Sequence, residues 1–384
     1  MARKKATRRK KASTQKKPSA SKKPPRGKKT AARKKALARK KAAARKSPAR
    51  KKAAARKSPA PKKGAARGKS RPRPHAARPQ SRAPAAEPPR VAAWIDVEIQ
   101  QRVQWRDGDV VVSVPVKSGT TWTMNIVHQL REGGDPDFED LYVEVPWLEL
   151  VPGPSVTREQ RLVKVDGMPA GRRRAFKTHS PPGPLPYQPP GAPDVRYVVV
   201  VRNPEEVLAS MHPFIAAHSD AWFELWQTPR DAFVRPDFRS FYYDVAQHAF
   251  GPMIFGFVAA WWPLRRQPNV LLMHFADMKR DHEGSVRRIA EFLGLEPNEE
   301  QWPAILEYTS FGWMKANERK FEIPTAAEVP VLDSGAMVRK GKVGAAHEDG
   351  VTPAISADIA LLGREILTDA AAFEWCYRGG PLPD

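Results

Sequence analysis

The sequence of 384 residues contains a single cysteine, Cys376. One thiol cannot form an intramolecular disulfide, so nothing in the sequence indicates an oxidising compartment. No cluster of cysteines and histidines has the spacing of metal ligands, and we expect no structural zinc. The chain also lacks an apolar run of about 18 residues that would span a bilayer, and no shorter apolar run marks a secretory signal after its basic start. We therefore expect a cytoplasmic protein without a membrane span.

Residues 1–90 have no aromatic residue and only one acidic residue, Glu87, against 36 lysines and arginines. The remaining 294 residues hold 30 basic and 40 acidic residues. The net charge of +25 therefore combines a strongly cationic tail with a mildly acidic remainder. Because the tail has too little apolar surface to offset the entropy of ordering, we predict a disordered tail and linker over 1–90 and a folded domain over 91–384.

The tail contains a short repeat, with KKAAARKSPA at 40–49 and again at 51–60. In composition it resembles the basic arms of linker histones and of bacterial histone-like proteins. Lysines and arginines bind nucleic acid by displacing counterions, and no aromatic residue is present to stack on bases. We predict that residues 1–90 bind nucleic acid or another polyanion without sequence preference, which includes association with a nucleoid. The alternative is a solubilising arm, or an arm that folds back on the acidic domain.

The stretch from 109 to 131 organises the rest of the chain. A β-branched run from Val110 to Val112, continuing through Val114 and Val116, predicts a buried strand. Apolar residues at helical spacing follow at Trp122, Ile126, Val127 and Leu130. Between them lies a small, hydroxyl-rich turn, Lys117-Ser118-Gly119-Thr120-Thr121. A strand that delivers such a turn to a helix N-terminus directs backbone N–H groups and the helix dipole at one point, and this predicts an anion site.

Three more segments predict buried strands: 174–178, 196–201 and 269–275. Helical segments alternate with them, among them 285–293. This order predicts an α/β fold, a P-loop-like, doubly wound parallel sheet flanked by helices. Ligands of such sheets bind at the carboxyl ends of the strands. Lys117, His179 and Arg202 all follow predicted strand ends.

Two motifs resemble those of the cytosolic-type sulfotransferases, which use 3′-phosphoadenosine 5′-phosphosulfate (PAPS). PVKSGTTW at 115–122 resembles the phosphosulfate-binding loop, and VVVVRNPEEVLASMHPF at 198–214 resembles the 3′-phosphate motif. The resemblance implies that the turn Lys117-Ser118-Gly119-Thr120-Thr121 binds the phosphosulfate and that Trp122 stacks on adenine. It also implies that Arg202 and Ser210 hold the 3′-phosphate.

Further motifs follow in the family's order. KTHSP at 177–181 is similar to KTHLP, which implies that His179 is the general base and that Lys177 assists the departing charge. The segment 308–317 resembles TSFxxMKxN, which implies that Thr309 and Phe311 line the adenine pocket. The segment 339–344 resembles RKGxxG, which implies contacts to the 3′-phosphate from Arg339, Lys340 and Gly341.

The chain departs from the family pattern at three places. Phe275 stands where the family commonly has a tyrosine, so it is expected beside adenine but without the hydroxyl. Residues 345–348 replace a DWKN-like stretch, and the dimer motif is not recognisable near the C-terminus, so the oligomeric state is left open.

Together the motifs predict transfer of a sulfuryl group from PAPS to a hydroxyl of a small-molecule acceptor. Lys117 would stabilise charge on the leaving oxygen, and positioning with charge stabilisation would supply most of the catalysis. No metal is expected, because the lysines and arginines supply the positive field. Six aromatic residues are candidates for an apolar acceptor pocket, although aromatic residues in such loops are as often part of the core: Trp222, Phe223, Trp226, Phe241, Tyr242 and Tyr243.

Two other functions compete with this prediction. In one, the domain is catalytically idle and the protein compacts or tethers nucleic acid through its tail; the intact set of Lys117, His179, Arg202 and Ser210 argues against it. In the other, the protein is a nucleoside or small-molecule kinase. The missing GxxxxGK[ST] pattern argues against a kinase.

Overall fold

The computed structural model describes residues 92–191 and 193–383. The predicted polyanion-binding tail, its disorder and the boundary at residue 90 lie outside these residues.

A four-stranded, wholly parallel sheet forms the centre of the domain, with the strand order β2-β1-β3-β4. The strands are β1 (Val110–Ser113), β2 (Ala175–Thr178), β3 (Arg196–Val201) and β4 (Val270–His274). The chain enters at β1, crosses to the edge strand β2 and then returns to β3 and β4 on the other side of β1. This is the doubly wound arrangement that the alternation of strands and helices predicts.

Successive strand residues point to two different hydrophobic clusters. Val111 and Val199 belong to one cluster, whereas Val110, Val112 and Val198 belong to the other. All five side chains are fully buried. A strand of a parallel sheet that is covered on both faces has a continuous run of apolar residues. The valine runs in the sequence therefore predicted these strands.

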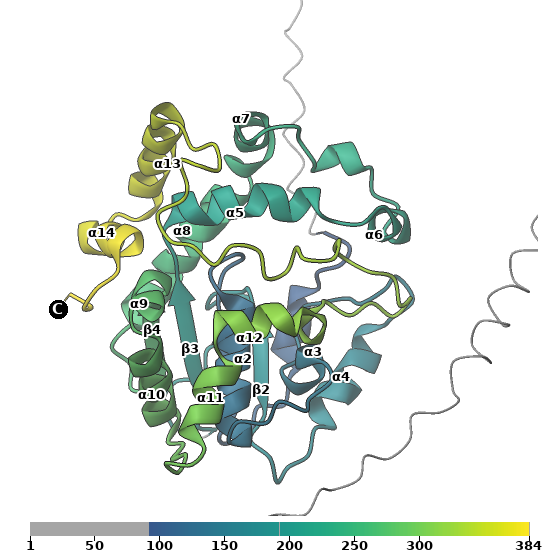
Figure 1. Ribbon diagram of the computed structural model, residues 1–384, viewed down its shortest axis with the longest axis vertical. Coiled ribbons are helices and arrows are strands. Elements are labelled where there is room, and N and C mark those ends of the chain that lie inside the picture. The colour runs from purple at the N-terminus through teal and green to yellow at the C-terminus, as the bar shows by residue number, and fades with distance from the viewer. Residues whose placement is uncertain (1–91, 192, 384) are drawn as a thin grey trace, which may run out of the picture. The chain divides into compact units, whose positions relative to one another are not determined.

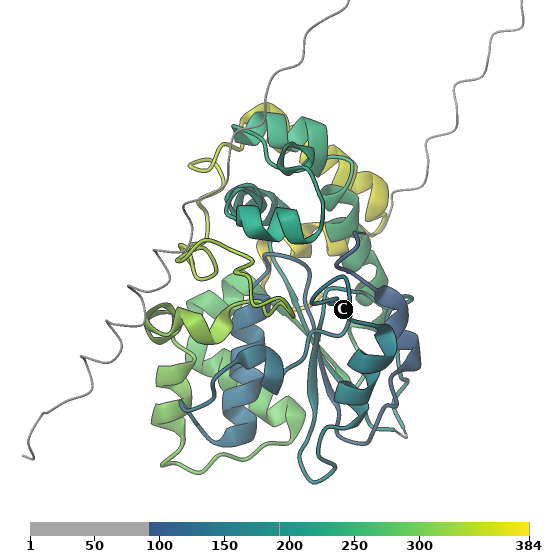
Figure 2. The same cartoon turned by 90° about the vertical axis from the view of Figure 1, so that its right-hand side faces the viewer.

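Helices cover both faces of the sheet. The first cluster packs the strands against α5, α8, α13 and α14, and the second packs them against α2, α10 and α11. The layers can be followed in Figure 1, and Figure 2 shows the strands between them from the side. The longer helices are α2 (Thr120–Glu132), α4 (Arg158–Asp166), α5 (Pro204–Ala216), α8 (Phe250–Trp261), α10 (His282–Leu293), α13 (Pro353–Ile366) and α14 (Ala370–Arg378).

Shorter helical segments connect these elements. They are η1 (Val97–Arg102), α3 (Leu141–Glu144), α6 (Asp220–Leu225), η2 (Arg230–Ala232), α7 (Phe238–Phe241), the π-helical η3 (Tyr242–Ala246), η4 (Trp262–Leu264), α9 (Phe275–Arg280), α11 (Trp302–Tyr308), α12 (Phe311–Ala316) and η5 (Glu318–Phe321). Within the described part of the chain, no helix is both long and apolar enough to cross a membrane.

The first strand is shorter than predicted. It ends at Ser113, and Val114 makes one more bond to Thr178 O at 3.1 Å before the chain turns. The prediction that the strand continues to Val116 is wrong, because Pro115 has no N–H to donate to a ladder. Pro115 instead begins a tight turn in which Ser118 N donates to Pro115 O at 3.3 Å.

Candidate active site

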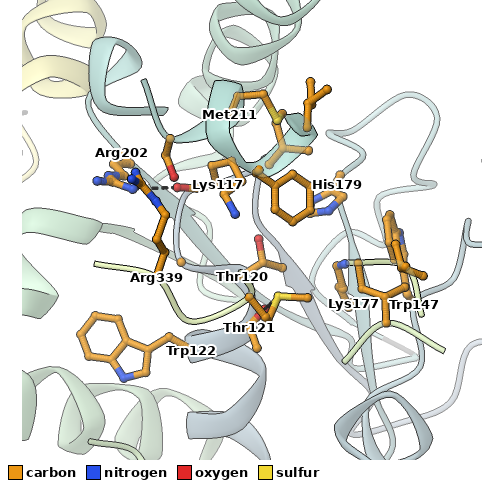
Figure 3. Close-up of a pocket in the computed structure, with 18 of the residues that line it drawn as sticks. Lys117, Thr120, Thr121, Trp122, Trp147, Lys177, His179, Arg202, Met211 and Arg339 are labelled. Atoms are coloured by element: carbon orange, nitrogen blue, oxygen red, sulfur yellow. Dashed lines mark hydrogen bonds between the residues drawn. The ribbon is translucent and has the colours of Figure 1, made fainter. Parts of the chain in front are cut away.

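The carboxyl ends of all four strands open into one cavity of about 800 Å³. Lys117 follows β1, His179 follows β2, Arg202 follows β3 and Phe275 follows β4, and all four side chains line it. The sheet therefore brings together residues that lie as far apart in the sequence as 117 and 275. Figure 3 shows Lys117 with Arg202 and Arg339 on one side and His179 on the other.

The turn after β1 has a strained backbone. Lys117 has φ +59° and Gly119 has φ +91°, both in the left-handed region. A Cβ on Gly119 would lie 2.7 Å from the ring of Phe275, so only glycine fits there. Gly119 is the N-cap of α2 and has no side chain to satisfy the first N–H groups of the helix. The first N–H groups of α2 therefore have no side-chain cap, at the position where the sequence predicts an anion site.

Three cationic side chains gather at this turn. Lys117, Arg202 and Arg339 are close enough that both arginines lower the pKa of Lys117. Burial is the larger cause, and together they lower the pKa of Lys117 to about 7. Its Nζ lies 3.7 Å from the centre of the Phe214 ring. An anion bound among these groups would relieve their mutual repulsion.

The Arg202 guanidinium is fixed in place by several contacts. Its Nε donates to Glu206 Oε2 at 2.9 Å, and another nitrogen donates to Lys117 O at 3.0 Å (Figure 3). A third donates to Lys342 O at 3.1 Å. The guanidinium carbon also lies 4.6 Å from the centre of the Phe275 ring. Arg202 thus joins the turn after β1 to the loop that contains Arg339.

The planar side chains near this cationic cluster are also held in place. Trp122 Nε1 donates to Thr309 O at 2.8 Å, and its ring lies 5.8 Å from that of Phe275. Gly341 has φ +58°, and a Cβ there would lie 2.6 Å from the Phe311 ring. The loop that contains Arg339 and Gly341 can therefore pack this closely against Phe311 only because residue 341 is glycine.

His179 is held in one tautomer. Its Nδ1 lies 2.6 Å from Val114 O, a group that can only accept, so Nδ1 carries the proton and Nε2 has a free lone pair. Its backbone N–H donates to Glu149 Oε1 at 2.6 Å. Burial, together with the positive charges of Lys177 and Lys117, holds the pKa of His179 well below its usual value. The imidazole is therefore neutral at pH 7.

Lys177 lies on the same side of the cavity as His179, across from Arg202 and Arg339 (Figure 3). Its Nζ is 3.2 Å from the centre of the Trp147 ring, and the Trp147 and His179 rings meet edge to face at 4.9 Å. Burial is the first cause that lowers the pKa of Lys177 to about 7. The nearby Glu149 carboxylate opposes this shift.

The cavity wall contains all but one of the predicted site residues. Thr120, Thr121, Ser210, Thr309 and Lys340 line it together with the residues described above. Ser118 does not: it is fully buried, and its hydroxyl faces Val116 O at 3.4 Å.

The six aromatic candidates for the acceptor pocket divide into two groups. Trp222, Phe223 and Trp226 line the cavity. Phe241 and Tyr242 are instead fully buried in the first cluster, and Tyr243 packs against it. For these three the core alternative holds, because α7 and η3 turn that segment toward the first cluster.

Sequence reasoning missed several residues of the cavity wall. Trp147 and Glu149 enter through a bridge of residue 147 to Lys177 at the edge of β2, and Tyr142 and Phe214 also line the wall. The only signal was the apolar side chains of Trp147, Leu148 and Leu150 in an otherwise acidic connection.

No set of three or more His, Cys, Asp or Glu side chains among the described residues is placed to hold a metal ion.

Comparison with known proteins shows which family the chain is similar to. The profile of the family described as "Sulfotransferase domain" matches residues 107–367. Mouse sulfotransferase 1A1 is 30% identical over 253 residues, which cover 64% of this chain and 80% of that protein. Human sulfotransferase 1E1 is 28% identical over 268 residues, or 66% of this chain and 81% of that protein.

Solved structures show the same fold. The mouse sulfotransferase SULT7A1 complexed with PAP aligns with a TM-score of 0.53 and 20% identity, covering 74% of this chain and 93% of that one. Retinol dehydratase in a complex with retinol and PAP aligns with a TM-score of 0.53 and 23% identity, covering 70% of this chain and 83% of that one. At these identities the likeness concerns the fold alone.

Proposed function

The chain belongs to the sulfotransferase domain family and is a sulfotransferase, and we propose that it transfers the sulfuryl group of PAPS to a hydroxyl of a small-molecule acceptor. The observation that carries this proposal is the free Nε2 of a neutral His179 in the same cavity as the Lys117, Arg202 and Arg339 cluster. A base and an anion site that share one cavity are what sulfuryl transfer to an alcohol requires.

On the nucleotide side, the start of α2 and Lys117 would hold the 5′-phosphosulfate. Arg202, Ser210 and the loop of Arg339 would hold the 3′-phosphate, where an arginine fork suits a dianion. Trp122 and Phe311 offer flat faces for adenine. The solved structures of SULT7A1 and retinol dehydratase are complexes with PAP, which is adenosine 3′,5′-bisphosphate. This supports a nucleotide of this kind.

On the acceptor side, His179 Nε2 would take the proton of the acceptor hydroxyl while the hydroxyl oxygen forms its bond to sulfur. The bond between sulfur and the bridging phosphate oxygen breaks, and Lys117 would stabilise the charge that builds on that oxygen. Lys177 would add to the positive field. His179 is suited to this role because its Nδ1–H is already committed to Val114 O, so only Nε2 can accept.

The test is calorimetry with adenosine 3′,5′-bisphosphate and with ATP, followed by turnover of PAPS with simple phenols. We expect the bisphosphate to bind at least about tenfold more tightly than ATP, because Arg202 and the Arg339 loop require a 3′-phosphate. Preference for ATP would support a kinase. Tight bisphosphate binding without transfer to any phenol or alcohol would support the idle domain.

Binding of the bisphosphate should weaken as the pH rises from 7 to 9. Lys117 has a pKa of about 7 in the free protein, so above that pH it must take up a proton to pair with an anion. The phosphate itself is fully ionised there, since its second pKa is about 6. Calorimetry in two buffers of different ionisation enthalpy should record the proton uptake.

Lys117→Met should remove this pH dependence. Lys177→Met is the matched control, since Lys177 also has a pKa of about 7 but lies on the acceptor side, and the dependence should remain in that variant. Equal affinity for the bisphosphate across pH 7 to 9 in the unmodified protein would contradict the assignment of Lys117 to the anion site.

We also propose that residues 1–90 bind nucleic acid or another polyanion. The support is compositional, namely 36 basic residues against one acid. Deletion of 1–90 should abolish binding to duplex DNA, and log affinity of the full chain should fall linearly with log salt at about −0.9 per phosphate contacted. Turnover of a small acceptor should survive the deletion, because every matched motif follows Trp94. DNA binding by the truncated chain would overturn the assignment.

A further inference from the structure

An acidic side chain, that of Asp349, lines the cavity among the cations of the proposed 3′-phosphate site. Its Oδ2 lies 3.3 Å from a guanidinium nitrogen of Arg339, and its Oδ1 lies 2.5 Å from Lys340 Nζ. Within the described part of the chain, neither cation has another hydrogen-bond or ion-pair partner. The carboxylate of Asp349 therefore pairs with both cations that the loop of Arg339 would offer to a phosphate.

Asp349 is ionised at pH 7. Burial acts to raise the pKa of this carboxyl, but hydrogen bonds from Lys340 and Arg339 outweigh burial and hold the pKa below its usual value. The charge of Asp349 also reaches the third cation of the site. Burial lowers the pKa of Arg202, and the negative charges of Glu206 and Asp349 oppose that shift. Asp349 thus acts on Arg202 as well as on the two cations of the loop.

The backbone holds the Asp349 carboxylate in place. Ala346 and Val351 are buried in the first cluster, and the N–H groups of Asp349 and Val351 both donate to Ala346 O at 3.1 Å. Gly350 has φ +103°, and a Cβ there would lie 2.7 Å from Phe238 Cβ, so the residue that follows Asp349 must be glycine. Because the segment is tied to the core on both sides of Asp349, the carboxylate stays near its cations when a ligand enters.

A 3′-phosphate bound by the same cations would lie beside this carboxylate. The phosphate has a charge of about −1.5 to −2 at pH 7, and two like charges close together disfavour each other. Asp349 directly follows residues 345–348, where the chain departs from the sulfotransferase pattern. The carboxylate is therefore a feature of this chain that the motifs did not predict.

We propose that Asp349 is an internal competitor of the 3′-phosphate. Its carboxylate pairs with Arg339 and Lys340 in the free protein, shares them with the bound nucleotide, and thereby weakens binding of the bisphosphate product and speeds its release. This rests on the proposed function, in which the loop of Arg339 holds the 3′-phosphate. PAPS has the same 3′-phosphate, so Asp349 weakens both nucleotides and raises turnover wherever product release is the slow step.

Asp349→Asn in the full chain tests this role. The amide keeps the size of the side chain and an acceptor oxygen for Arg339 and Lys340, but it has no charge. Calorimetry should show adenosine 3′,5′-bisphosphate binding about three- to thirtyfold more tightly than to the unmodified protein, and stopped-flow displacement should show slower dissociation. Adenosine 5′-phosphosulfate has no 3′-phosphate, and its affinity should stay within about twofold.

Three further variants complete the experiment. Asp349→Ser is also uncharged and should give a gain for the bisphosphate, whereas Asp349→Glu keeps the charge and should stay within about threefold of the unmodified protein. Glu348→Gln is the matched control, because Glu348 is exposed and does not line the cavity. The same change of charge there should leave the affinity for both nucleotides unchanged. Binding of adenosine 5′-phosphosulfate shows whether each variant is folded.

Weaker or unchanged binding of the bisphosphate in the uncharged variants would overturn the proposal, because the carboxylate would then only orient the two cations. An equal gain for both nucleotides, or an equal gain in Glu348→Gln, would reveal a general effect of charge and would overturn it too. The proposed function fails separately. A gain specific to the bisphosphate, in a protein that transfers no sulfuryl group, would uphold the role of Asp349 and reject the transfer.

Discussion

His179→Ala is expected to lower kcat by about 10²–10⁴ while adenosine 3′,5′-bisphosphate binds within about threefold of its normal affinity. The substitution removes the Nε2 that would take the proton, together with the contact of Nδ1 with Val114 O. It leaves the backbone N–H that donates to Glu149 Oε1, which still ties the loop after β2 to that carboxylate. Turnover of PAPS with a phenol and calorimetry with the bisphosphate measure the two effects separately.

His248→Ala is the matched control for this substitution. His248 is exposed and does not line the cavity, so its loss should leave both turnover and nucleotide affinity unchanged. If binding of the bisphosphate fell together with turnover in His179→Ala, the histidine would belong to the nucleotide site or to the fold. Its role as a base would then be wrong.

Arg202→Ala should weaken adenosine 3′,5′-bisphosphate by roughly 10- to 150-fold, which corresponds to about 1.5–3 kcal/mol for hydrogen bonds to a charged group. Adenosine 5′-phosphosulfate has no 3′-phosphate and should lose much less affinity. Some loss is expected for both ligands, because Arg202 also donates to Lys117 O and so steadies the turn that holds the 5′ end. Calorimetry with the two nucleotides gives the ratio.

Arg280→Ala serves as the control for Arg202→Ala. Arg280 is 70% exposed and pairs with Asp277, so its removal should change neither affinity. Equal losses for the two nucleotides in Arg202→Ala would show that the arginine supports the turn and does not read the 3′-phosphate.

Much of the fold could be predicted because the sheet is buried on both faces. Residues 196–201 were predicted as a strand and form β3 with the same bounds, and 269–275 was predicted within one residue at each end of β4. Prediction failed where one residue changed the backbone. The valine pattern from 110 to 116 continues past Pro115, but the strand does not, because a missing N–H ends a ladder regardless of the residues that follow.

The sequence by itself determined which residues meet at the carboxyl ends of the strands. Lys117, His179 and Arg202 each follow a strand, and parallel strands bring their carboxyl ends to one edge, so local order was enough to place them together. The rest of the acceptor side was decided only by the tertiary structure. Trp147 and Glu149 come from a connection that has no periodic pattern, and of the six aromatic candidates Phe241 and Tyr242 lie in the core, with Tyr243 packed against it. Which side chains of an irregular connection face a cavity depends on packing against distant segments. The tautomer of His179 depends on such a contact too, because Val114 O fixes it.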